Sequence, residues 1–90
     1  YSETAEISFY VRVSHHSKGL GTKILESLLE LARENKFHTV ISRITDGSSA
    51  SVKIHQNFNF EMIGKMREVG RKFGKLLDVI LMQKMNLLKQ

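Results

Sequence analysis

Apolar and polar residues alternate near the start of the chain. Ser8, Tyr10 and Arg12 separate a set of β-branched and aromatic residues, Ile7, Phe9, Val11 and Val13. A period of two with these residue types predicts a strand over about residues 5–13. From Gly19 the period becomes that of a helix, with one apolar stripe made of Ile24, Leu25, Leu28, Leu29, Leu31 and Ala32. We predict an amphipathic helix that ends near Asn35–Lys36.

Four shorter elements follow. HTVISRI, residues 38–44, predicts a second strand; DGSS, 46–49, is typical of a turn; and 49–58 predicts a short helix. Two more strands are predicted at 60–68 and 76–85, joined by a basic hairpin loop, GRKFGK, at 70–75. The order β-α-β-α-β-β predicts an α/β (α+β) fold with a mixed sheet. We expect the first two strands to be parallel and the last two to form an antiparallel hairpin.

Composition narrows the class of protein. Ninety residues make one small domain, and 41% hydrophobic with 26% charged residues is typical of a globular protein. With no cysteine, a disulfide framework and a thiolate metal site are excluded, and a cytoplasmic location is expected. No apolar run approaches the roughly 20 residues of a membrane span. The chain opens with Tyr1 and soon enters a strand pattern, which is typical of a piece of a longer protein.

The strand-to-helix turn contains two closely spaced glycines, Gly19 and Gly21. A glycine turn at a helix start is a ready anion site, because the first N–H groups lack partners and the helix dipole is positive there. Lys18 and Lys23 add positive charge. The P-loop pattern is absent, and the dinucleotide fingerprint fails because Ile24 occupies the third glycine position. The spacing alone leaves a phosphate site and a plain tight turn equally open.

Four segments in order carry a family resemblance. HHSKGLGTKILESLLELARENKF resembles motif A of the GNAT acetyltransferases, and SASVKIHQNFNF resembles the second helix and following strand of that superfamily. AEISFYV and VGRKFGKLLDVILMQ resemble the phosphinothricin N-acetyltransferase-like subfamily. The resemblance implies that residues 1–90 are a single partial GNAT domain, its C-terminal part, with the family's N-terminal elements missing.

The resemblance also implies a function and a site. The function would be transfer of acetyl from acetyl-CoA to a primary amine of a small amino-acid-like acceptor. The pyrophosphate would lie on the turn formed by Lys18, Gly19, Leu20, Gly21 and Thr22, and the pantetheine arm would pair with the backbone near Val11 and Val13. Glu6 aligns with the subfamily's carboxylate base and His55 with its catalytic histidine.

The residue types suit that chemistry. An amine arrives mostly as ammonium, so a base must remove a proton before the nitrogen can attack a thioester. Glu6 fits this role, and His55 fits either a base or the acid that protonates the departing thiolate. The alternatives are a solvated strand carboxylate for Glu6 and a surface histidine on a short helix for His55.

Other readings of the chain are weaker. A truncated, inactive GNAT fragment that only binds CoA or another protein is one alternative function. The +5 net charge is also compatible with nucleic-acid binding. A solvated loop is the better explanation of the basic residues Lys65, Arg67, Arg71, Lys72 and Lys75. We expect no metal, no nucleic acid and no membrane partner, and we expect core packing roles for Met62, Met66, Met82 and Met85. The first strand would have an open edge, so a homodimer is expected.

Overall fold

A computed structural model describes residues 3–10, 19–45 and 49–88. It contains four strands and two helices: β1 (Thr4–Phe9), α1 (Leu20–Glu34), β2 (Thr39–Ile44), α2 (Ser49–Asn57), β3 (Glu61–Lys72) and β4 (Lys75–Lys84). The predicted order β-α-β-α-β-β is therefore confirmed. The predicted part of the first strand beyond Tyr10 lies outside the described residues.

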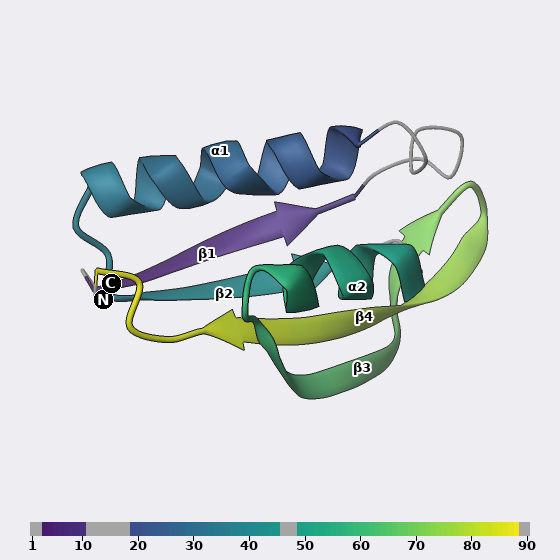
Figure 1. Ribbon diagram of the computed structural model, residues 1–90. Coiled ribbons are helices and arrows are strands. Elements are labelled where there is room, and N and C mark those ends of the chain that lie inside the picture. The colour runs from purple at the N-terminus through teal and green to yellow at the C-terminus, as the bar shows by residue number, and fades with distance from the viewer. Residues whose placement is uncertain (1–2, 11–18, 46–48, 89–90) are drawn as a thin grey trace.

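The strands form one mixed sheet in the order β1-β2-β4-β3 (Figure 1). β1 and β2 are parallel, with α1 as the crossover between them, whereas β4 is antiparallel to both β2 and β3. Both pairings agree with the sequence prediction. β1 lies at one edge of this four-stranded sheet, as expected for a strand that lacks an outer neighbour.

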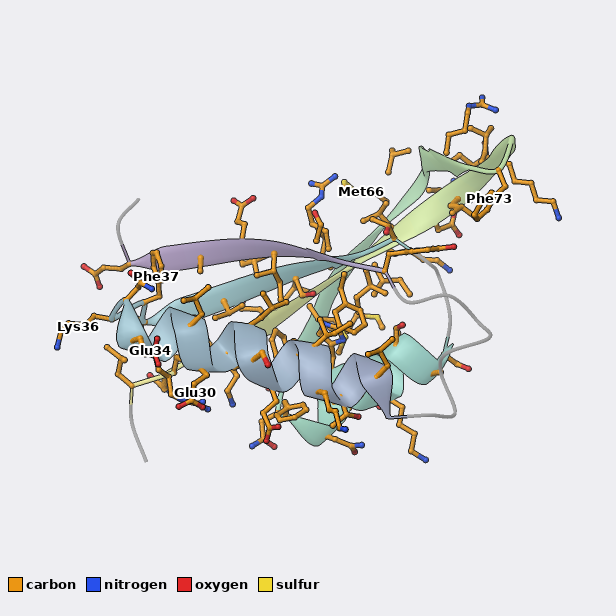
Figure 2. All side chains as sticks on the ribbon, turned by 90° about the horizontal axis from the view of Figure 1, so that it is seen from above. Glu30, Glu34, Lys36, Phe37, Met66 and Phe73 are labelled. Atoms are coloured by element: carbon orange, nitrogen blue, oxygen red, sulfur yellow. The ribbon has the colours of Figure 1, made fainter. Side chains whose placement is uncertain are left out.

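Both helices lie on the same face of the sheet, and no described helix covers the opposite face (Figure 2). The core fills the space between the helices and the sheet. From the sheet it takes Phe9, Val40, Ile44, Ile80 and Met82, and from the helices and connections Leu25, Leu29, Ala32, Phe60 and Leu87. The uncovered side of the sheet will be called the open face.

The apolar stripe of α1 is only partly buried. Leu25, Leu29 and Ala32 face the core, but Ile24 and Leu31 are 37% and 55% exposed. The predicted stripe was therefore too wide, because a single sheet covers only one side of a helix. The methionine prediction was right for Met82, which is fully buried, and wrong for Met62 and Met85, which are about half exposed.

Both helices end in the same hydrogen-bonded motif. After α1, Phe37 N–H donates to Ala32 and Lys36 N–H donates to Arg33; after α2, Phe60 donates to His55 and Asn59 to Gln56. This six-to-one and five-to-two pattern is a Schellman motif, whose C′ residue has a left-handed backbone. Lys36 (φ 62°) and Asn59 (φ 67°) occupy those positions. Asparagine tolerates the left-handed backbone better than most residues, so Asn59 suits this position.

The β3–β4 hairpin is longer than predicted. The loop expected at 70–75 is wrong, because β3 continues to Lys72 and β4 begins at Lys75, which leaves only Phe73 and Gly74 between them. Both have positive φ, 51° and 77°, as a type I′ turn requires. The two shifts of register between β3 and β4 fall at Met62/Gly64 and Met66/Gly70. Beside the second shift, the Asp78 carboxylate accepts a 3.1 Å bond from the amide of Glu68.

Candidate functional site

The N-terminus of α1 lies at the carboxyl end of β1 (Figure 1). Gly19 is the N-cap residue, with φ 71° and ψ 8°, and its carbonyl accepts the first helical bond from Lys23 at 3.1 Å. A Cβ at Gly19 would meet nothing within 4 Å, so the left-handed backbone, and not crowding, favours glycine here. The helix start predicted at Gly19 is confirmed, and the choice between a phosphate site and a plain turn stays open.

This helix start has the features of an anion site. No side chain caps it, and its first turn carries no acidic residue. Leu20 and Thr22 are exposed, whereas Gly21 is buried. The first N–H groups of a helix have no intrahelical acceptors and the dipole is positive at this end, so an anion would supply what the chain does not. The described part of the predicted cofactor turn is thus Gly19, Leu20, Gly21 and Thr22.

Val11, Val13 and Lys18 lie outside the described residues, so their roles stay predictions. β1 is hydrogen-bonded to its parallel neighbour as far as Phe9. Phe9 carbonyl accepts a 3.1 Å bond from the amide of Thr45 and a 3.4 Å bond from its hydroxyl. Hydrogen bonding along β1 therefore continues to its last residue.

Glu6 lies on the open face of the sheet. In β1, Ala5, Ile7 and Phe9 pack with the core, whereas Glu6 and Ser8 are exposed. Successive strand residues point to opposite faces, which explains this division. The side chain thus projects toward the open face, on the side of the sheet opposite α1 and α2.

His55 is fully buried, so the alternative of a surface histidine is wrong. Its Nδ1 is 2.8 Å from the carbonyl oxygen of Ser51, and its Nε2 is 2.7 Å from the hydroxyl of Ser42. A carbonyl only accepts, so Nδ1 carries a proton; in the neutral ring Nε2 then accepts from Ser42. Phe9 and Phe60 flank the imidazole edge to face, at 4.7 and 4.9 Å between ring centres.

The two predicted catalytic residues lie on opposite sides of the sheet. Glu6 is on the open face. His55 is buried on the other face, where it is hydrogen-bonded to the inward-pointing side chain of Ser42 in β2. The structure does not bring them together. Sequence reasoning missed Ser42 altogether. Its only signal was a single hydroxyl among the apolar residues of VISRI, a strand whose inward positions are otherwise Val40 and Ile44.

A groove runs along the outer edge of β1. Its volume is about 340 Å³, and it lies between that strand and α1. Ile7, Leu28, Leu31 and Phe37 supply much of its apolar lining, together with Thr4, Ala5, Glu6, Ala32 and Asn35. The groove explains why Leu31 stays exposed, because no described element covers this side of α1.

Two further findings concern the described residues alone. No three histidine, cysteine, aspartate or glutamate residues among them are grouped so that they could hold a metal ion. Neither α1 nor α2 has the length and apolar character needed to cross a membrane.

Comparison with known proteins points in one direction. Residues 1–81 match the family model described as the acetyltransferase (GNAT) domain. Over 80 residues the chain is 42% identical to the L-methionine sulfoximine/L-methionine sulfone acetyltransferase of Pseudomonas aeruginosa, covering 89% of this chain and 46% of that protein. It is 39% identical over 83 residues to the L-amino acid N-acyltransferase MnaT of Escherichia coli, covering 92% and 48%.

A solved structure adds the same fold with a ligand. The chain resembles a GNAT superfamily phosphinothricin acetyltransferase from Sinorhizobium meliloti, solved in complex with AcCoA, with a TM-score of 0.65 and 30% identity. That match covers 77% of this chain and 37% of that one. The chain thus spans about half the length of the curated relatives it matches.

Proposed function

Because the chain belongs to the GNAT acetyltransferase family, and resembles its phosphinothricin N-acetyltransferase-like members, we propose that it transfers acetyl from acetyl-CoA to a primary amine. The acceptor is a small amino-acid-like molecule, and residues 1–90 form one partial GNAT domain. The names of the relatives, which act on methionine sulfoximine, methionine sulfone and L-amino acids, support this acceptor class. The observation that carries the proposal is the position of the uncapped glycine start of α1. It lies at the carboxyl end of β1, the strand that carries the exposed carboxylate of Glu6 (Figure 1).

The cofactor end of the site is the turn at residues 18–22. The pyrophosphate of acetyl-CoA would accept bonds from backbone N–H groups of Gly19, Leu20, Gly21 and Thr22, with the Thr22 hydroxyl as a further donor. The absence of an acidic residue in the first turn supports this assignment, because a carboxylate there would repel the phosphates. Lys18 adds charge, and the backbone near Val11 and Val13 pairs with the pantetheine arm.

Glu6 is the proposed base. Its carboxylate removes a proton from the acceptor ammonium, the nitrogen attacks the thioester carbonyl, and the tetrahedral intermediate collapses with release of CoA thiolate. No ion pair or hydrogen bond among the described residues occupies the Glu6 carboxylate. That carboxylate is therefore available to an amine on the open face.

His55 is the proposed acid for the thiolate, and its position limits how it can act. It contacts Phe9, the last residue of β1, so it lies beneath the end of the strand pair. In the neutral ring Nε2 accepts from Ser42, so His55 acts as an acid only after Nε2 gains a proton. That proton then leaves by way of the Ser42 hydroxyl or after Ser42 turns away. His55 also has a structural role, because its buried hydrogen bond with Ser42 connects α2 to β2.

We also propose a cytoplasmic homodimer, with no metal and no nucleic acid partner. The chain has no cysteine, which suits a reducing compartment. Self-association is supported by the edge position of β1 and the apolar groove beside it. An unpaired strand edge is a template for pairing with another chain.

Substitution of Glu6 tests the proposal directly. Glu6→Gln keeps the shape of the side chain but removes the base, so turnover of acetyl-CoA with L-methionine sulfone should fall roughly 10²–10⁴-fold. Glu3→Gln, which neutralises another exposed carboxylate just before β1, is the matched control and should keep wild-type activity. Thiol release and acetylated product are both measured. Full activity in Glu6→Gln, or no product from the wild type, would contradict the proposal.

A further inference from the structure

The open face carries a second exposed charge close to Glu6. In the parallel pairing of β1 with β2, Ser8 lies opposite Arg43 and Glu6 lies opposite Ile41. Arg43 is therefore the diagonal neighbour of Glu6, two residues beyond Ile41 in β2 and on the same face of the sheet. Arg43 is exposed, whereas its flanking residues in β2, Ser42 and Ile44, are buried toward the helices. Glu6, Ser8 and Arg43 thus project from the same face.

These two charges are not used by the fold. Within the described chain, neither the Glu6 carboxylate nor the Arg43 guanidinium makes an ion pair or a side-chain hydrogen bond. A surface pair between them would contribute only about 0–1 kcal/mol, so the fold loses little by leaving them apart. A positive and a negative group therefore remain available to a ligand on one open surface.

Their spacing suits a small zwitterion. Neighbouring strands are about 4.8 Å apart and diagonal cross-strand neighbours are about 7–8 Å apart, within reach of long side chains. An α-amino acid carries its amino group and its carboxylate on one carbon, so both groups fit between a carboxylate and a guanidinium at this separation. Arginine suits the carboxylate because its planar fork offers two parallel N–H donors.

We propose that Arg43 binds the α-carboxylate of the acceptor and so delivers the acceptor amine to Glu6. The inference rests on the proposed function and names the residue that selects amino acids over simple amines. Ser8 follows Glu6 by two residues in β1 and lies opposite Arg43 on the same face. Its hydroxyl is a further partner for the acceptor. Ile41 and Leu81, which pair with Glu6 and Arg43 in the sheet, are half-buried and border the remainder of the acceptor.

Two acceptors that differ by one carboxylate provide the test. L-methionine sulfone carries the group, and 3-(methylsulfonyl)propylamine is the same molecule without it. With the full chain, Arg43→Gln should lower kcat/KM for L-methionine sulfone roughly 10–100-fold, mainly through KM, as expected for one charge-assisted contact. The same variant should leave kcat/KM for the simple amine within about twofold. Arg33→Gln, an exposed arginine on α1, is the matched control.

A binding measurement separates this inference from the proposed function. L-methionine sulfone is titrated into ¹⁵N-labelled wild type and Arg43→Gln, and amide shifts of β1 and β2 are followed. Weaker binding in Arg43→Gln supports the inference even if neither protein turns over. Turnover of both acceptors with equal loss, or with no loss, in Arg43→Gln overturns the inference alone. Absence of both turnover and binding overturns the inference and the proposed function together.

Discussion

Ser42→Ala should destabilise the protein more than any exposed serine substitution. The hydroxyl of Ser42 meets Nε2 of His55 at 2.7 Å, and both side chains are 0% exposed. Removing the hydroxyl leaves a fully buried ring nitrogen without this donor, in a place that water does not reach. The Nδ1 bond to Ser51 fixes the ring orientation, so the imidazole cannot simply turn to another partner.

The expected cost follows from that burial. A buried polar group that loses its partner costs about 1–3 kcal/mol, because its hydration was given up on folding and is not recovered. Total stability of a domain is only about 5–15 kcal/mol, so this loss is readily measured. Replacing both partners by apolar groups costs much less. Ser42→Ala combined with His55→Phe should therefore cost less than the sum of the single changes, with a coupling of about 0.5–3 kcal/mol.

Urea unfolding followed by far-ultraviolet circular dichroism measures these differences. All four proteins are compared at one protein concentration, because self-association would add to the apparent stability. Ser8→Ala is the control, since Ser8 is exposed on β1, and it should change the free energy of unfolding by no more than about 0.5 kcal/mol. A Ser42→Ala protein as stable as wild type, or strictly additive single changes, would refute the account of this buried pair.

Three further predictions concern other parts of the molecule. Phe73→Asn should raise stability by roughly 0.5–1 kcal/mol, because Phe73 is 78% exposed with φ 51° and asparagine tolerates that backbone in a type I′ turn; a lower melting temperature would contradict this. Burial and then the charge of Arg33 lower the pKa of Lys84 below its ordinary 10.5, so Arg33→Gln should raise that pKa in an NMR titration. The unfolded chain holds the Lys84 proton to higher pH than the folded protein does, so the contribution of Lys84 makes the free energy of unfolding rise as pH rises toward 10.5. An unchanged Lys84 pKa in Arg33→Gln would contradict the role given to the Arg33 charge. The open edge of β1 predicts self-association, which sedimentation at micromolar concentration should detect, whereas a monodisperse, cooperatively melting monomer of 10.3 kDa would show that the sheet edge needs no partner.

The order and pairing of the elements could be predicted because they depend on local pattern. Alternation around Ile7 and the helical stripe around Leu25 are readable in short windows, and a strand, crossover helix and strand leave few topologies. The hairpin was misjudged because Gly70 and its basic neighbours look like a loop. They belong to a strand only because Leu77 and Leu76 pair with Gly70 and Arg71, and a local window does not contain that pairing.

Less of the candidate site could be predicted. The start of α1 at Gly19 was predictable, because the hydrophobic period changes there to that of a helix. The burial of His55 was not predictable from its short, weakly amphipathic helix, since it depends on how α2 packs against Ser42 and between Phe9 and Phe60. The separation of Glu6 from His55 by the sheet is likewise a tertiary fact. The sequence pattern told which residue types were present, but not which face each one occupies.

The most direct test of the central claim is acetyl-CoA binding to Thr22→Glu, measured by titration calorimetry. Thr22 is exposed at the third position of α1. A carboxylate there interacts favourably with the helix dipole and stabilises the fold by about 0.3–1 kcal/mol, but it repels phosphates. We predict that Thr22→Glu unfolds at a higher urea concentration than wild type yet binds acetyl-CoA at least roughly tenfold more weakly, the effect of about 1.4 kcal/mol of lost binding. The control Thr22→Gln also removes the hydroxyl but adds no negative charge, so it should bind acetyl-CoA more tightly than Thr22→Glu does. Equal affinity in wild type and Thr22→Glu, or no acetyl-CoA binding by the wild type, would contradict the assignment of this helix start as the cofactor site.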